Sequence, residues 1–438
     1  MARHLNPDLW QEASSQHERV YCLGKCYAAP ASSADDKLPA VEVDSAEPII
    51  LSRIIEGGAR TVEAYARSEG YSALEQSLSR SPEEIIRDVE ISSLRGRGGA
   101  GFPTGKKWRA VSQQPSLEKF VIANADEGDP GAFVDRFIME YDPHSLIEGL
   151  MIAGYAVGAT RGFIYLRAEY PLSHAVLQEA LADARRAGLL GENILHSGFS
   201  FDIEIAPGQG SYVCGEETAL INSIEGRRPE AQPRPPFPTQ CGLFGKPTLV
   251  NNVETLANIP WIIRKGGDAY RRLGFSNSRG TKVVSLNSLF NRPGLYEIEF
   301  GVSVRHIVEE LGGGLKTGEI RGVIIGGPLA GIIPPPLLDT PFGFEELRAI
   351  GASVGHGGAV AFDERTSIPE LIHHVFDFGA YESCGRCTPC RAGSRRVEKI
   401  FERILANGAA GIKERTEFDD IVSALAQTSL CGLGTGLA

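Results

Sequence analysis

Hydrophobic residues between positions 93 and 265 occur in two kinds of segment that alternate along the chain. Short apolar runs predict strands, and longer stretches with an apolar residue every three or four positions predict helices. The strands are expected at 120–123, 162–166 and 201–205, and the helices at 145–159, 171–187 and 216–225. This alternation predicts an α/β domain whose helices cover a sheet.

The regions on either side of this domain have other patterns. Before it, helical spacing of apolar residues predicts helices at 49–68 and 81–90, the second starting with Ser81-Pro82-Glu83-Glu84. Serine as the cap, an early proline and an acidic first turn are typical of a helix start. After it, two strands at 283–286 and 295–300, a helix at 303–311 and a strand at 322–325 fit a small β-grasp-like unit.

The chain beyond residue 366 is predicted to be helical. Ser367-Ile368-Pro369-Glu370 has the form of a capping box. Apolar residues then recur on one helix face at Val397, Ile400, Phe401, Ile404 and Leu405, and again at Phe418, Ile421, Val422 and Leu425 behind a Thr416 cap. A bundle of helices is the expected architecture.

Composition narrows the class of protein. The 438 residues carry a net charge of −11, which argues against nucleic acid or an anionic membrane as the main partner. No apolar run approaches the 18 residues of a membrane span, and no export signal is visible, so the cytoplasm is expected.

Four cysteines near the C-terminus have the spacing of a metal site. Cys384, Cys387 and Cys390 form a CxxCxxC loop between two predicted helices, and Cys431 follows a third. Four thiolates are the usual ligands of a [4Fe–4S] cluster. A structural zinc site is the alternative, although such sites usually consist of two separated CxxC pairs.

Glycine-rich segments provide the second signal. Residues 95–108 hold four glycines within 96–101, followed by Lys106 and Lys107. Glycines let backbone N–H groups approach phosphate oxygens, and a lysine can balance their charge. The segment matches neither the Walker pattern nor the Rossmann fingerprint, so a glycine turn without a ligand remains the alternative.

Polar residues next to two further loops could bind a nucleotide. Residues 124–131 follow a strand, where ligands bind in α/β sheets, although an ordinary Asp/Gly/Pro turn has the same composition. Glu216 and Glu217 follow a second glycine loop, and they either cap a helix or accept hydrogen bonds from ribose hydroxyls. Asn252 has the same ambiguity as a helix cap.

Together these segments resemble, from about residue 49 to 437, the NADH-binding flavoprotein subunit of respiratory complex I. They resemble equally the diaphorase subunits of NAD-linked hydrogenases and formate dehydrogenases. The resemblance implies FMN, NAD(H) and a [4Fe–4S] cluster as cofactors. It implies three sets of residues: Gly96, Gly98, Lys107, Asn124, Asp126, Gly215, Asn251 and Asn252 for FMN; Phe102, Asp129, Tyr212, Glu216, Glu217, Arg234 and Phe237 around the flavin and NADH; and Cys384, Cys387, Cys390 and Cys431 for the cluster.

The resemblance also implies the domains. It predicts a Rossmann-like FMN/NADH domain at 49–270, a ubiquitin-like (SLBB-type) β-grasp domain at 271–340, a connector at 341–365 and a helical cluster domain at 366–438. Residues 1–48 would be a partial thioredoxin-like segment and linker. Their Cys22 and Cys26 resemble half of a [2Fe–2S] site, but no cluster is predicted because the first cysteine pair is absent.

The implied function is NADH dehydrogenase (diaphorase) activity. NADH gives a hydride to FMN, and single electrons then pass to the cluster and to a partner, or the flow runs in reverse. No acid–base residue is required. A thioredoxin-like [2Fe–2S] subunit and further Fe–S subunits are the expected partners, in the cytoplasm or at the periphery of a membrane complex. The alternative is a non-catalytic iron–sulfur scaffold or electron relay.

Overall fold

A parallel four-stranded sheet lies at the centre of the larger part of the molecule. The structure is a computed structural model that describes residues 22–29, 31–32 and 37–438. Strands β4 (Asp202–Pro207), β3 (Arg161–Leu166), β2 (Phe120–Ala125) and β5 (Thr248–Asn252) lie side by side in that order. All neighbouring pairs are parallel, so their carboxyl ends meet at one edge. The α/β prediction for this region is confirmed.

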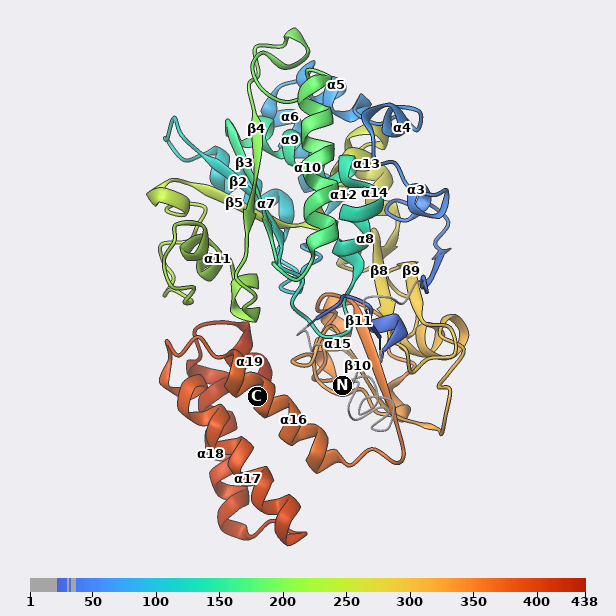
Figure 1. Ribbon diagram of the computed structural model, residues 1–438, viewed down its shortest axis with the longest axis vertical. Coiled ribbons are helices and arrows are strands. Elements are labelled where there is room, and N and C mark those ends of the chain that lie inside the picture. The colour runs from blue at the N-terminus through green and yellow to red at the C-terminus, as the bar shows by residue number, and fades with distance from the viewer. Residues whose placement is uncertain (1–21, 30, 33–36) are drawn as a thin grey trace.

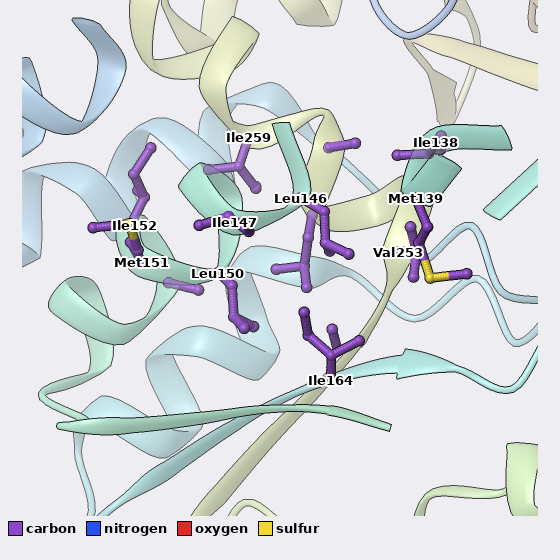
Figure 2. Close-up of a cluster of buried hydrophobic side chains, with 14 of the residues drawn as sticks. Ile138, Met139, Leu146, Ile147, Leu150, Met151, Ile152, Ile164, Val253 and Ile259 are labelled. Carbon is purple, nitrogen blue, oxygen red and sulfur yellow. The ribbon is translucent and has the colours of Figure 1, made fainter. Parts of the chain in front are cut away.

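Helices cover both faces of this sheet, because the strands are apolar on both sides. Helices α9 (Pro143–Val157) and α12 (Val253–Ala257) pack on one face, as Figure 2 shows for Leu146, Leu150 and Val253 near Ile164 of β3. Helix α11 (Glu217–Ile224) packs on the other face. The remaining helices of this part are α7 (Thr104–Ser112), α8 (Val134–Tyr141), α10 (Pro171–Arg186), α13 (Ile259–Lys265) and α14 (Gly267–Arg272).

The helices before the sheet correct one prediction. The single helix expected at 49–68 is wrong, because the chain forms α3 (Ser52–Ile55) and α4 (Val62–Ala66) with a break between them. Gly57 and Gly58 have φ values of 102° and 86° in this break, which end a right-handed helix. A helix absent from the prediction follows, α5 (Ser72–Leu78). The predicted cap is confirmed, since α6 (Pro82–Ser92) starts with a Ser81–Glu84 capping box.

A second, five-stranded sheet forms beside the first. Its order is β1 (Ala40–Asp44), β9 (Gly294–Glu299), β8 (Thr281–Leu286), β11 (Gly358–Asp363) and β10 (Ile320–Ile325). The predicted helix at 303–311 is reduced to a π-helical segment at His306–Leu311. The sheet takes β1 from the predicted N-terminal linker and β11 from the predicted connector, which also holds α15 (Phe344–Ala349). Its assignment to the β-grasp class and the domain boundaries remain predictions.

The C-terminal region is helical and projects from the rest of the molecule, drawn in orange and red in Figure 1. It consists of α16 (Ile368–Glu382), α17 (Ser394–Asn407), α18 (Ile412–Thr428) and α19 (Gly432–Leu437). Ser367 caps α16 by accepting a hydrogen bond from the Glu370 backbone at 3.4 Å. The Thr416 cap is wrong: α18 begins earlier, and the Thr416 hydroxyl donates to the Ile412 carbonyl at 3.1 Å.

None of the helices in the described part of the chain has the length and apolar content that crossing a membrane requires.

Candidate active site

The glycine loop closes tightly against the end of β5. The Gly96 N–H donates to the Phe102 carbonyl at 2.9 Å, which makes residues 96–102 a closed turn. A Cβ on Gly98 would lie 2.9 Å from the Cβ of Asn252, which real structures essentially never show. The absence of a side chain at Gly98 therefore lets the glycine loop approach the end of β5 closely. A ligand that binds to the backbone of this loop requires the same close approach. The Thr104 hydroxyl, just after this loop at the start of α7, is buried and has no hydrogen-bond partner.

The two asparagines after β5 bind other parts of the protein. The Trp108 indole donates to Asn251 Oδ1 at 3.0 Å. Asn252 Oδ1 accepts from the Thr255 N–H at 3.1 Å and caps α12, as the alternative interpretation predicted. Asn252 Nδ2 donates to Asp135 Oδ2 at 2.6 Å. Both side chains are thus held rigidly at the carboxyl edge of the sheet.

The loop after β2 carries a buried acid. Asn124 Nδ2 donates to the Gly215 carbonyl at 2.8 Å, which ties this loop to the second glycine loop. Asp126 is 4% exposed, and its carboxylate accepts no hydrogen bond from the described residues. Burial raises the pKa of Asp126 to about 8, and the charges of Glu169 and Glu382 add to the effect while Arg167 opposes it. A buried acceptor of this kind suits a polar group of a ligand.

Tyr212 joins this loop to the C-terminal helices. Its hydroxyl donates to Asp129 Oδ1 at 2.7 Å, and its backbone N–H donates to Glu382 Oε2 at 3.0 Å. Its ring packs edge-on against Phe378 of α16, with 5.2 Å between the centroids. Glu382 is the last residue of α16 and precedes Cys384 by two positions. The structure thus brings two predicted regions, distant in sequence, into direct contact.

The carboxylate of Glu217, which follows the second glycine loop, is paired with two cations from other segments. Lys107 Nζ lies 2.9 Å from Glu217 Oε2, and Arg234 Nη1 lies 3.0 Å from Glu217 Oε1. Glu216 caps α11 by accepting from the Thr218 and Ala219 N–H groups at 3.0 Å, as the capping alternative predicted. Lys107 therefore already has a carboxylate partner, and its predicted contact with FMN stays a prediction.

Two aromatic side chains stand apart from these contacts. Phe102 is 52% exposed and Phe237 is 48% exposed, although both are large and apolar. Each borders a polar loop, beside Gly101 and after the Arg234 segment respectively. They offer ring faces on which a planar ligand could stack.

Sequence reasoning missed a buried cluster beneath the 126–131 loop. His356 Nε2 lies 2.9 Å from Asp135 Oδ2 and His356 Nδ1 lies 3.9 Å from Glu127 Oε1. Glu127 belongs to the predicted 124–131 segment. His356 comes from the turn before β11, more than 200 residues away, and no pattern in its surroundings marks it.

The four predicted cluster cysteines converge at one end of the C-terminal bundle. Burial raises the pKa of Cys390 to about 11, and the neighbouring Cys387, Cys431 and Cys384 add to the effect. Cys431 is the N-cap residue of α19, and Cys384 is also among the neighbours that raise its pKa. Four thiols are the donor set expected for an iron–sulfur cluster.

The N-terminal cysteines lie next to the loop that follows β2. Cys22 and Cys26 are free thiols, and the Leu23 carbonyl between them accepts from Arg136 Nη1 at 2.9 Å. Tyr27 packs edge-on against Phe133 with 5.1 Å between the centroids. Residues 1–21, 30 and 33–36 of the predicted thioredoxin-like segment lie outside the described residues, and its assignment stays a prediction.

Comparison with known proteins decides the family. Residues 89–261 match the model of the Nuo51 FMN-binding domain, and residues 370–438 match that of the NADH-ubiquinone oxidoreductase-F iron-sulfur binding region. The F 2 subunit of the NADH-quinone oxidoreductase of Rhizobium meliloti (strain 1021) is 42% identical over 395 residues, which cover 90% of this chain and 93% of that protein. This chain belongs to the family of F-type subunits of NADH-quinone oxidoreductase.

The chain is also similar to components of hydrogenases. The NADP-reducing hydrogenase subunit HndC of Solidesulfovibrio fructosivorans is 46% identical over 378 residues, which are 85% of this chain and 76% of that protein. A solved NAD⁺-reducing [NiFe]-hydrogenase in the H₂-reduced state matches with a TM-score of 0.77 at 35% identity. That match covers 90% of this chain, which spans 64% of the hydrogenase chain.

Membership in this family identifies the cofactors. The two matched regions are an FMN-binding domain and an iron–sulfur binding region, so the chain is an oxidoreductase with FMN and a [4Fe–4S] cluster. The residues present fit both groups: the unpartnered Asp126 carboxylate and the Gly98 cradle suit a flavin, and the four thiols suit a cluster. The zinc site and the non-catalytic scaffold are not favoured.

Proposed function

We propose that this protein oxidises NADH at an FMN held at the carboxyl edge of the β2–β5 sheet, and passes electrons singly to a cluster on the C-terminal bundle. Bound FMN supplies the chemistry that the side chains lack, since a flavin takes a hydride and releases single electrons. The proposal is carried by the contacts of Tyr212. It binds Asp129 of the 126–131 loop, here called the flavin loop, and Glu382, which precedes the cluster loop at 384–390.

The FMN contacts are assigned as the motifs predicted. The backbone of the glycine loop and the side chain of Lys107 would hold the phosphate end. The polar groups after β2 and β5 would face the ring. In this arrangement Asp126 is an acceptor for a polar group of the ring, because burial favours its pairing with a donor. The FMN set comprises Gly96, Gly98, Lys107, Asn124, Asp126, Gly215, Asn251 and Asn252.

The NADH contacts lie on the outer side of these residues. Phe102 and Phe237 are half-exposed and would provide the stacking faces for the nucleotide. Asp129 and Tyr212 form one hydrogen-bonded pair that would orient the nicotinamide end. Glu216, Glu217 and Arg234 complete the set beside them.

The charges around Glu217 favour NADH over NADPH. Of the two nearby cations, Lys107 is assigned to the FMN phosphate and Arg234 is already paired with Glu217. A carboxylate binds ribose hydroxyls, whereas a 2′-phosphate requires an available cation. We therefore expect kcat/KM to be higher for NADH. Substitution of Glu217 by Gln should reduce this preference.

The four cysteines would hold the cluster as thiolates. Cys384 and Cys387 would contribute from the loop after α16, Cys390 from the π-helical segment Pro389–Gly393 that leads into α17, and Cys431 from the start of α19. Since the Tyr212–Glu382 contact joins this loop to the nucleotide loops, the chain provides a short path for an electron.

Further subunits would receive the electrons. A thioredoxin-like [2Fe–2S] subunit and other Fe–S subunits are proposed as partners, without nucleic acid or membrane insertion, in the cytoplasm or at the periphery of a membrane complex. Support comes from the named relatives, which are themselves subunits of an NADH-quinone oxidoreductase and of hydrogenases.

Anaerobic titration tests the proposal. NADH should bleach the flavin absorbance of the purified protein and then produce the paramagnetic signal of a reduced cluster. A preparation with no flavin, or one whose flavin NADH leaves oxidised, would refute it. Purification of the native complex would identify the partner subunits.

A further inference from the structure

A buried histidine lies between two carboxylates beneath the flavin loop. His356 is 4% exposed. Its Nε2 lies 2.9 Å from Asp135 Oδ2, and its Nδ1 lies 3.9 Å from Glu127 Oε1 and has no hydrogen-bond partner among the described residues. Both carboxylate side chains are fully buried. One imidazole ring therefore faces a negative group from each of its nitrogens.

The hydrogen bonds around these carboxylates favour a protonated imidazole over a metal ion. Glu127 accepts from the Asp135 and Arg136 N–H groups at 2.7 and 3.0 Å and from the Tyr170 hydroxyl at 3.0 Å. Asp135 accepts from the Glu254 N–H at 3.2 Å and from Asn252. Every oxygen of the two acids thus already accepts at least one N–H or O–H, and the acceptor sites left over suit the N–H groups of an imidazolium.

The charges facing His356 come from several elements. Asp135 on α8 and Glu127 and Asp129 on the flavin loop attract a proton to it, whereas Lys282 on β8 repels one. Lys282 itself is buried and paired with Glu254 of α12. Burial would lower the pKa of His356, but the charge and hydrogen bond of Asp135 and the charge of Glu127 raise it to about 9.

His356 reaches the predicted flavin contacts through its neighbours. Asn252 donates to the same Asp135 oxygen that His356 binds, and Asn252 packs against Gly98 of the glycine loop. Gly355, the residue before His356, forms a β-bridge with Gly99 of that loop. The charge of His356 also lowers the pKa of Asp129, which burial raises.

We propose that His356 is a positioning residue of the flavin site, a buried imidazolium that fixes Asn252 through Asp135 and offsets the negative charge of the 126–131 loop. The inference rests on the proposed FMN site. A reduced flavin carries more negative charge than an oxidised one, so a nearby buried cation stabilises the reduced form. His356 thereby raises the flavin midpoint potential without touching the substrate.

The test is His356→Gln in the full chain with its cofactors. Glutamine keeps a donor for Asp135 but has no charge. We expect the flavin midpoint potential to shift to a lower value and the FMN dissociation constant to rise about tenfold, as for the loss of a charged hydrogen bond. In the wild type the potential should fall more steeply above about pH 9, where His356 has lost its proton in the oxidised protein and takes it up on reduction, and this step should be absent from the variant.

The matched control is His144→Gln. His144 is also buried, bonded to the Tyr71 hydroxyl at 2.7 Å and near the Arg60 carbonyl at 3.2 Å, but it lies on α9 outside the proposed site. Burial lowers its pKa to about 4, so it is neutral. This variant should melt earlier while its flavin potential stays that of the wild type.

The outcomes distinguish a failure of the proposed role of His356 from a failure of the proposed function. A His356→Gln protein that binds FMN with wild-type affinity and potential would overturn the role of His356. A wild type that neither binds FMN nor is bleached by NADH would refute the proposed function instead. If the variant does not fold, the pH titration of the wild type decides, because a flavin potential with no extra pH dependence above about pH 9 contradicts the buried imidazolium.

Discussion

The two redox sites of this chain are built in opposite ways. The flavin side is assembled from loops far apart in sequence, which interlock through buried charges such as Asp135 with His356 and Glu254 with Lys282. The cluster side consists of one short loop and Cys431 at the end of a small helical bundle. Figure 1 shows this bundle projecting from the rest of the molecule.

The flavin side and the cluster side also differ in how many apolar side chains they bury. The core around the β2–β5 sheet holds dozens of buried side chains on both faces. The bundle core holds far fewer, namely Phe376, Cys390, Val397, Ile400, Phe401, Leu425, Leu433 and Leu437. One of these residues, Cys390, is itself a proposed cluster ligand. A small core that includes a ligand is expected to depend on its metal group for stability, whereas the loops of the flavin side rest on a large core that contains no proposed ligand.

Loss of one cluster ligand should separate the two sites most clearly. In Cys387→Ala we expect the paramagnetic signal of the cluster to disappear and the 366–438 region to become sensitive to protease. FMN should stay bound and be bleached by NADH, because the flavin core does not depend on the bundle. Electron paramagnetic resonance and limited proteolysis measure both outcomes.

The control for this variant is Cys241→Ala, since Cys241 is an exposed thiol outside the bundle. An unchanged cluster signal in Cys387→Ala would disprove the ligand assignment. Simultaneous loss of FMN would show that the two sites fold as one unit, contrary to the comparison.

A change in the glycine loop should damage the flavin side alone. A Cβ at position 98 meets Asn252 at 2.9 Å, so Gly98→Ala must displace the loop or the asparagine. We expect FMN affinity to fall about 100-fold, the scale of a few kcal/mol of overpacking, with the cluster intact. At Gly96 the nearest atom to a new Cβ is 3.7 Å away, so Gly96→Ala should weaken FMN binding much less. Equal losses in the two variants would contradict a packing role for Gly98.

The contrast between the sites also explains what the sequence alone could predict. The iron–sulfur region was predictable because three cysteines lie within seven residues, so their spacing alone indicates their chemistry. The strands β2, β3 and β4 and the Ser81 cap were predictable for the same reason, since each depends on neighbouring residues, whereas β5 was not predicted. The flavin motifs became interpretable only together, because a glycine turn or an Asp-Gly-Pro turn is common without a ligand.

The missed features depend on contacts between distant segments. The charge on His356 arises from Asp135 and Glu127, more than 200 residues earlier, and no local pattern encodes it. Likewise β11 is recognisable as a strand only once β8 and β10 lie on either side of it. The break at Gly57 and Gly58 was a local signal that the helical periodicity of 49–68 concealed.

The contact between the two sites should have an intermediate effect. Tyr212→Phe removes the hydroxyl that donates to Asp129 but keeps the ring that packs on Phe378. We expect kcat/KM for NADH to fall about tenfold, the cost of one hydrogen bond to a charged group. FMN content and the cluster signal should not change. Phe378→Leu, which alters the packing partner but leaves the hydrogen bond, serves as the comparison, and a wild-type kcat/KM in Tyr212→Phe would argue against the orienting role of the pair.

The smallest expected effect is a dependence of stability on pH that comes from the flavin side. Several groups there hold protons more tightly when folded, among them His356, whose pKa is raised from 6.5 to about 9, Asp126, whose pKa is raised from 3.8 to about 8, and Glu127, whose pKa is raised from 4.5 to about 7. At a pH between the ordinary pKa of such a group and its raised pKa, the folded state binds more protons than the unfolded state. The free energy of unfolding therefore falls as pH rises through this range. His356 contributes fully below pH 6.5 and loses its contribution as pH rises through 9. We expect this loss to be about 2 kcal/mol, or a melting temperature about 4 °C lower at pH 9 than at pH 6.5, as measured by calorimetry of the flavin-free protein. His356→Gln should flatten the profile and His144→Gln should leave its slope unchanged, whereas a wild type that melts at the same temperature throughout this range would contradict the buried imidazolium.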